Sequence, residues 1–199
     1  SYATKENPDV WQTIEFWYEG NSGLSKSSGD RNSTGLSPRK NIPMDATTDK
    51  SQATCTSNAI PFPTIRLGEI YLNYIEAVLE CKRNNVTGDN VDLDKALLLW
   101  DELRARVNLG STTEICSSSD YDALIELLRQ ERRVELAWEL HRYFDVRRWF
   151  IAHGEQGVLN TPCYGLDVTR GKNATDPDFF TQTECSLQRV FRLEHYFAP

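Results

Sequence analysis

The chain has 199 residues, of which 39% are hydrophobic and 11% aromatic. This composition supports one ordinary hydrophobic core and argues against intrinsic disorder. The net charge is −7, with 22 Lys plus Arg against 29 Asp plus Glu. A protein that neutralises a phosphate backbone carries the opposite sign, so nucleic acid is excluded as an expected partner. No run of residues approaches the roughly 18 apolar residues of a membrane span.

The first third of the chain has the composition of loops. Residues 19–64 are rich in Gly, Ser, Thr, Asn and Pro, which punctuate regular structure. Two stretches, TIEFWYE (13–19) and GLSPRKNIP (35–43), carry β-favouring or extended residues flanked by turn formers. We therefore expect residues 1–65 to form a loop-rich segment with one or two short strands.

A helical period begins at Arg66 and predicts two antiparallel helices. The apolar face expected for the first helix consists of Leu67, Ile70, Tyr71, Tyr74, Val78 and Leu79. After a turn, Asp92 or Asp94 can cap a second helix. The inward residues expected for this helix are Leu93, Ala96, Leu97, Trp100, Leu103 and Val107. It is predicted to end at residues 108–110, where Asn and Gly tolerate a left-handed backbone.

A third helix is predicted to begin near Asp120, and its continuation breaks the simple pattern. Its apolar opening consists of Leu124, Ile125, Leu127 and Leu128. The stretch ERRVELAWELHRYFDVRRW (131–149) then places charges on the same helical face as these leucines. Two explanations remain: the chain turns near residues 139–141 and starts a fourth helix, or one helix is covered on several sides.

Under either explanation some of these charges are sheltered from water. A sheltered carboxylate is costly unless it is paired, and the forked donors of arginine suit carboxylates. We interpret the stretch as an ion-pair seam between helices, with a structural role. The residues of this predicted seam are Glu131, Arg132, Arg133, Glu135, Glu139, Arg142 and Asp145.

The helical core is expected to span residues 66–153, and residues 154–199 are predicted to form an irregular tail packed on the helices, because helical periodicity ends there. Aromatic residues at helical spacing are predicted to lie in the core. They are Tyr71, Tyr74, Trp100, Trp138, Tyr143 and Trp149.

Motifs for catalysis and metal binding do not stand out. The sequence has no HExxH, GxSxG or phosphate-binding glycine motif. His141 and Asp145 are spaced to share a helix face as a base and its orienter, but without a second nearby histidine structural hydrogen bonding is favoured. The five cysteines lack metal-ligand spacing; Cys163 could pair with Cys185, but free thiols are favoured. Nucleophilic and nucleotide chemistry therefore lack a signal in the sequence, and we predict no metal and no cofactor.

Three stretches resemble the SusD/RagB family of nutrient-binding outer-membrane lipoproteins. They are RLGEIYLNYIEA (66–77), LRARVNLG (103–110) and ERRVELAWELHRYFDVRRW (131–149), and they follow in the family's order and spacing. The chain departs from the family at Leu140, where glycine is usual. Because leucine does not readily take a left-handed backbone, this departure predicts a shifted turn or a helix that runs on. Asn108, in place of another family glycine, can still take the left-handed turn.

The resemblance implies a mainly α fold of tetratricopeptide-like helical hairpins, with long irregular loops and a few short strands. It also implies a cell-surface protein that is not an enzyme, and that binds oligosaccharides and delivers them to a TonB-dependent, SusC-like transporter. Such a protein is held at the outer membrane by a lipid anchor upstream, and this chain is expected to be the C-terminal portion. The alternative function is a helical-repeat scaffold that binds protein and no sugar.

Sugar recognition uses aromatic rings against C–H faces, with polar groups at the edges. Rings on loops are better candidates than rings on helices. The predicted ligand-binding residues are therefore Trp11, Trp17 and Tyr18, with Asn21, Arg31 and Arg39 as polar companions. The alternative is that these rings pack against the helices, since tryptophan is often largely buried.

Overall fold

A computed structural model describes residues 2–4, 7–12, 18–20, 40, 63–169, 176–184 and 189–197. The chain divides into two compact units, one made of residues 63–145 and the other of residues 1–62 and 146–199. We call them the helical unit and the second unit. The strands expected at 13–19 and 35–43 fall mostly on residues outside the described ranges.

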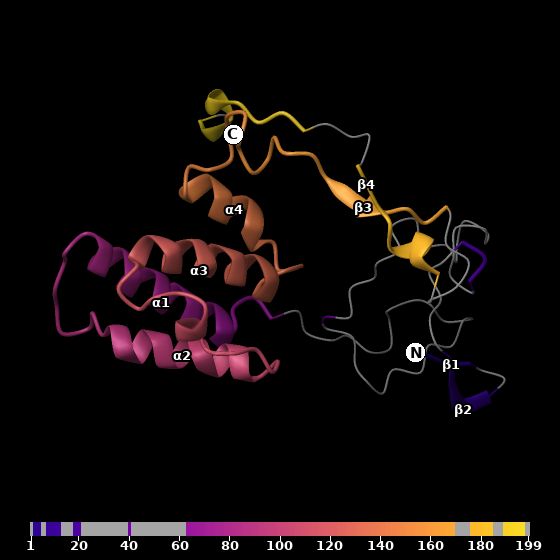
Figure 1. Cartoon of the computed structure of the whole chain (residues 1–199), viewed down its shortest axis with the longest axis horizontal. Helices are drawn as coiled ribbons and strands as arrows, with labels where there is room; N and C mark the ends of the chain where they lie inside the picture. Colours follow the sequence, from indigo (N-terminus) through magenta and orange to yellow (C-terminus); the bar gives the residue numbers. More distant parts are fainter. Residues whose placement is uncertain are drawn as a thin grey trace. The chain divides into compact units, whose positions relative to one another are not determined.

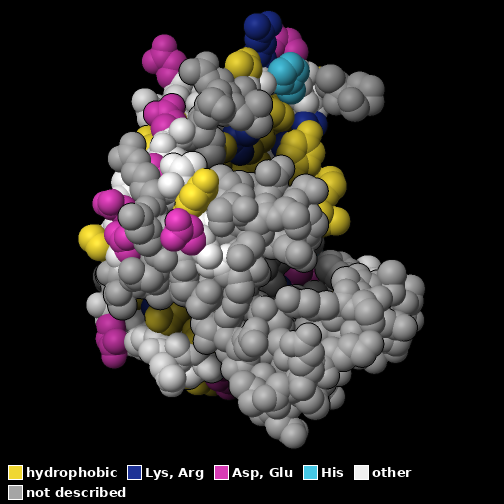
Figure 2. All heavy atoms as spheres, turned by 90° about the vertical axis from the view of Figure 1, so that its right-hand side faces the viewer, with side chains coloured by type: hydrophobic (Ala, Val, Ile, Leu, Met, Phe, Trp, Pro, Cys, Tyr) yellow, Lys and Arg dark blue, Asp and Glu magenta, His cyan; other side chains and the backbone are white. Residues whose placement is uncertain are grey.

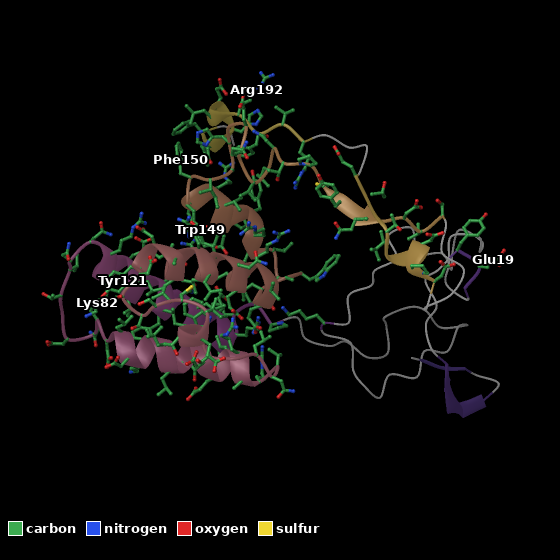
Figure 3. All side chains as sticks on the ribbon, viewed as in Figure 1. Glu19, Lys82, Tyr121, Trp149, Phe150 and Arg192 are labelled. Atoms are coloured by element: carbon green, nitrogen blue, oxygen red, sulfur yellow. The ribbon has the colours of Figure 1, made fainter. Side chains whose placement is uncertain are left out.

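The helical unit is built from three long helices and the start of a fourth. They are α1 (Leu67–Arg83), α2 (Leu93–Ala105), α3 (Tyr121–Glu135) and α4 (His141–Arg148), with the 3-10 helix η2 (Thr112–Glu114) between α2 and α3. Helix α1 packs against both α2 and α3 (Figure 1). Lys82 and Tyr121 lie at the same end of α1 and α3 (Figure 3). The predicted mainly α class is confirmed.

The starts of α2 and α3 follow from capping side chains. A carboxylate oxygen of Asp92 accepts a hydrogen bond from the backbone N–H of Lys95 at 3.0 Å, and Asp120 accepts from Ala123 at 3.0 Å. Each satisfies a backbone donor that lacks a partner in the first helical turn. Of the two predicted caps for α2, the structure selects Asp92. The predicted left-handed residue after α2 is Asn108, with a φ of 58°.

The core of the helical unit lies between α1, α2 and α3. Its fully buried side chains include Leu72, Ile75, Leu79, Trp100, Leu124 and Leu128. The predicted face of α1 was partly wrong, because Leu67 and Ile70 are exposed, and so was Val107 after α2. Apolar residues of α1 lie on two sides of the helix, one side with Leu67 and Ile70 and the other with Leu72 and Ile75. Contact with α2 and α3 decides that the side with Leu72 and Ile75 is buried.

The turn between α3 and α4 settles the two explanations for residues 131–149. Helix α3 ends at Glu135 and α4 begins at His141, so the chain turns and starts a fourth helix. Trp138 and Leu140 have left-handed backbones, with φ of 67° and 64°. The expectation that Leu140 shifts the turn or extends the helix was therefore wrong. The leucine adopts the conformation that favours glycine.

Two aromatic residues predicted to lie in the core are exposed instead. Trp138 is 70% exposed and Tyr143 is 50% exposed, whereas Trp100 is fully buried as predicted. The periodicity argument failed because it assumed a continuous helix. The left-handed backbone at Trp138 moves the indole out of the helical register of α3.

Replacing Leu140 by glycine is expected to stabilise the protein by about 0.5 to 1 kcal/mol. The side chain is 80% exposed, so little packing is lost, and the left-handed backbone no longer carries a Cβ. Urea denaturation measures the change. The control is Leu98→Gly, at an exposed position inside α2, which should destabilise by about 1 kcal/mol. Equal effects of the two changes would contradict the prediction.

Within its described residues, the second unit has two small antiparallel sheets and two 3-10 helices. Strand β1 (Tyr2–Thr4) pairs with β2 (Asn7–Gln12), and β3 (Tyr164–Leu166) pairs with β4 (Gln182–Glu184). The 3-10 helices are η3 (Pro177–Phe180) and η4 (Leu193–Tyr196).

None of the helices in the described ranges has the length and apolar character to cross a bilayer. Cys163, before β3, carries a free thiol.

A small cluster ties η4 to the end of α4 within the second unit. Arg147 donates hydrogen bonds to the carbonyl oxygens of His195 and Tyr196 at 2.7 and 2.8 Å. The hydroxyl of Tyr196 accepts from the backbone N–H of Ala152 at 2.8 Å, and its ring stacks on Phe150 with centroids 4.5 Å apart. Phe150 and Arg192 mark this region in Figure 3.

Candidate functional site

The structure gathers ion pairs where α1 begins and α3 ends. The Nε of Arg66, the N-cap residue of α1, donates to both carboxylate oxygens of Glu139 at 2.8 Å. Its Nη1 donates to Glu135 Oε1 at 2.7 Å and its Nη2 to the Glu135 carbonyl at 2.6 Å. Arg106 donates to the same Glu135 carboxylate at 2.7 Å. Arg66 therefore links the start of α1 to Glu135, the last residue of α3, and to Glu139 in the turn that follows.

A second pair lies deeper, between α3 and α4. Nε and Nη2 of Arg132 donate to the two carboxylate oxygens of Asp145 at 3.1 Å, and both residues are almost fully buried. Nη1 of Arg132 donates to Asn73 of α1 at 2.7 Å. This bidentate pair joins three helices.

A third pair involves Glu131 and the buried Arg104 of α2. Nη1 of Arg104 donates to Glu131 at 2.6 Å, and its Nε donates to the carbonyl of Gly110 at 2.7 Å. Arg104 thus holds both α3 and the loop that follows α2. The arginines that pair with Glu131, Glu135 and Glu139 come from outside the predicted set.

The paired charges change the protonation equilibria of this region. Burial raises the pKa of Glu135, but hydrogen bonds from Arg66 and Arg106 outweigh it and hold the pKa below its ordinary value. Burial likewise opposes the charge on Arg66, and the two glutamates outweigh it, so the pKa of Arg66 is raised. Each group stays charged over the whole neutral range.

Glu135 should make stability fall in acid. Its pKa is lower in the folded protein than the ordinary 4.5, so its contribution is complete above about pH 4.5 and is lost as the pH falls through the folded value. Urea denaturation from pH 7 to pH 3 should show Glu135→Gln losing its disadvantage relative to the parent protein in the acid range. A constant difference at every pH would contradict this.

The remaining members of the predicted seam are placed differently. Arg133 is exposed on α3, and Arg142 is half-buried at the start of α4. Burial lowers the pKa of Arg142, as do Arg133 and then Arg129, against the opposing effect of Asp145. His141 lies 3.6 Å from Glu69, and Asp145 uses both oxygens on Arg132. His141 and Asp145 therefore do not form a catalytic pair in this structure.

The predicted ligand-binding residues lie largely outside what the structure describes. Trp17, Asn21, Arg31 and Arg39 are outside the described residues, and for Trp11 only the backbone, in β2, is described. Tyr18 lies in a turn and is exposed. These residues stay predictions.

Within the described residues, three exposed rings lie in the α3–α4 turn or in the first turn of α4. We call Trp138, Tyr143 and Phe144 the ring group; all three are exposed, and the rings of Tyr143 and Phe144 meet edge to face at 5.6 Å. Sequence analysis missed these residues, although it identified the turn that frees Trp138. Figure 2 shows that hydrophobic side chains also reach the surface on one face of the described part. Across the described ranges, no three His, Cys, Asp or Glu side chains are grouped to hold a metal ion.

The sequence profile described as the SusD family matches residues 3–199. The chain belongs to the SusD family. Comparison with curated proteins gave no match. Among solved structures, the chain is similar to a SusD-like protein from Bacteroides fragilis, with 32% identity and a TM-score of 0.48. That match covers 67% of this chain and 21% of the Bacteroides chain, so this SusD-family chain spans only a small part of that relative's length.

Proposed function

We propose that this SusD-family protein binds oligosaccharides at the cell surface and does not transform them. The observation that carries the proposal is the match of the SusD family to residues 3–199. In this role the protein is held at the outer membrane by a lipid anchor and delivers its ligand to a TonB-dependent, SusC-like transporter. It needs no cofactor for binding.

The ring group supports the proposal at the level of chemistry. Exposed indole and phenol rings offer flat faces for the C–H groups of a sugar, and Tyr143 adds a hydroxyl group at its edge. We include Trp138 and Tyr143 as ligand-binding candidates beside Trp11, Trp17 and Tyr18. A ring held on a short turn between two helices is also more rigidly placed than a ring on a long loop.

A glycan microarray followed by calorimetric titration tests the proposal. We expect a dissociation constant of about 1 mM or tighter for at least one oligosaccharide. Trp138→Ala should abolish measurable binding if the ring group carries the site, and Trp17→Ala or Trp11→Ala if the N-terminal rings do. Leu98→Ala, which removes an exposed apolar side chain from α2, is the control and should bind normally.

The outcomes separate the function classes. Binding to no oligosaccharide, together with capture of a protein partner, favours the helical-repeat scaffold. Release of reducing sugar on prolonged incubation would identify a hydrolase instead of a binding protein.

A further inference from the structure

A phenylalanine stands just beyond α4 at a backbone position that favours glycine. The N–H of Phe150 donates to the carbonyl of Arg147 at 3.0 Å, and the N–H of Ile151 donates to that of Val146 at 3.1 Å. These two bonds form a Schellman cap, whose left-handed residue is Phe150, with a φ of 59°. A Cβ makes this conformation unfavourable. An interaction of the Phe150 side chain must therefore offset the cost.

Tyr196 covers one face of the Phe150 ring. The two rings stack with their centroids 4.5 Å apart and their planes at 26°. His153 meets Phe150 edge to face with centroids 4.8 Å apart, and it meets Tyr196 in the same manner at 5.3 Å. The three centroids form a nearly equilateral triangle, so His153 stands beside the stacked pair and does not cover the opposite face of Phe150. In agreement, Phe150 is 51% exposed.

Polar contacts fix these rings in place and orient the imidazole. The hydroxyl of Tyr196 accepts a hydrogen bond from the N–H of Ala152 at 2.8 Å and lies 3.2 Å from Nδ1 of His153. The arrangement that also uses the hydroxyl hydrogen has Tyr196 donating to Nδ1, which leaves the hydrogen of the neutral imidazole on Nε2. His153 then offers its Nε2–H as a donor at the edge of the Phe150 ring.

We infer that Phe150 and His153 form a second sugar-binding subsite, in which the open face of Phe150 stacks on a sugar ring and Nε2–H of His153 donates to a sugar oxygen. The inference rests on the proposed function and adds a contact in the second unit, whereas the ring group lies in the helical unit. A rigidly held, exposed ring with a donor at its edge suits the C–H face and the hydroxyl groups of a sugar. Such a role accounts for a phenylalanine at a glycine position.

Calorimetric titration of the full 199-residue chain tests the stacking contact. The probes are cellohexaose, maltohexaose and mannohexaose, together with any further oligosaccharide bound on the glycan microarray. Phe150→Leu keeps an apolar side chain but removes the flat face, and should weaken binding roughly fivefold or more. Phe150→Tyr keeps the face and should bind as the parent protein does. Tyr164→Leu removes another exposed ring of the second unit, in β3, and is the matched control with unchanged affinity.

Two further variants test the donor. His153→Leu removes the Nε2–H and should also weaken binding roughly fivefold. His153→Gln places an amide N–H group near the position of Nε2, so it should lose less than His153→Leu. Equal losses in the two variants would remove His153 from the subsite.

Fluorine NMR gives a readout that does not depend on the stability of a variant. The parent protein is labelled with 4-fluorophenylalanine, and the resonance that is missing from labelled Phe150→Tyr is assigned to Phe150. This resonance should shift on addition of a bound oligosaccharide, because the sugar replaces water at the open ring face.

The outcomes distinguish the subsite from the proposed function. Sugar binding that Phe150→Leu leaves intact and that does not shift the Phe150 resonance overturns the inference, while the proposed function stands. In that case a lower unfolding midpoint of Phe150→Leu would show that the ring serves its packing on Tyr196. Binding to none of the oligosaccharides contradicts the proposed function, and the inference falls with it.

Discussion

Replacing Arg132 by leucine is expected to lower the free energy of unfolding by about 3 to 5 kcal/mol. Asp145 is almost fully buried and accepts hydrogen bonds from Arg132 on both carboxylate oxygens. Without Arg132 this carboxylate loses its bidentate partner in a region with little water. A buried carboxylate that has lost these two charge-assisted hydrogen bonds costs free energy. Urea denaturation at pH 7 measures the loss.

The double variant Arg132→Leu, Asp145→Leu is the informative control. It removes both charges, and replacing a buried pair by apolar side chains is often close to neutral, so part of the lost stability should return. Arg83→Leu breaks the more exposed pair with Asp122 and should cost about 1 kcal/mol or less. If Arg132→Leu abolished sugar affinity while leaving the unfolding midpoint unchanged, the residue would belong to a ligand site and not to the architecture.

Replacing Trp100 by alanine is expected to destabilise the protein by about 3 to 5 kcal/mol. Trp100 is the largest fully buried side chain of the helical unit and lies in the core shared by α1, α2 and α3. Its removal leaves a cavity that rigid helices cannot fill by small movements. Thermal and urea denaturation should agree on the size of the loss.

Trp100→Phe separates the volume of the side chain from its polar group. Within the described part of the chain, the Nε1–H of Trp100 is buried without a hydrogen-bond acceptor. Phenylalanine removes that donor together with some volume, so the loss should stay below about 2 kcal/mol. Trp138→Ala, at the exposed tryptophan, should cost about 0.5 kcal/mol or less. A large loss at Trp138 would mean that its ring is covered in solution.

The ion pairs illustrate how far sequence reasoning reaches at the candidate site. The density of acids and arginines in residues 131–145 predicted a seam between helices, and its glutamates and Arg132 do form ion pairs. Their partners Arg66, Arg104 and Arg106 are distant in sequence and were not predicted. Charge density is a local property, whereas the choice of partner depends on which helices lie side by side.

Helix starts, helical class and family could be read from the sequence alone. Asp92 and Asp120 act within their own helical turns, so their capping requires no tertiary contact. Family motifs are likewise stretches of contiguous residues. These features were predicted because short-range geometry is set by the chain itself.

Tertiary structure decided which of the two apolar sides of α1 is buried, and it placed Trp138 and Leu140 in left-handed conformations at the α3–α4 turn. Leucine and tryptophan avoid that backbone on their own, by about 1 to 2 kcal/mol per residue. The ion pairs of Glu135 and Glu139 with Arg66, on either side of Trp138, and the pair of Asp145 with Arg132 fix the positions of both helix ends. The turn must then join those ends in five residues, and this constraint outweighs the local preference. The exposure of Trp138, and with it the candidate site, follows from that packing.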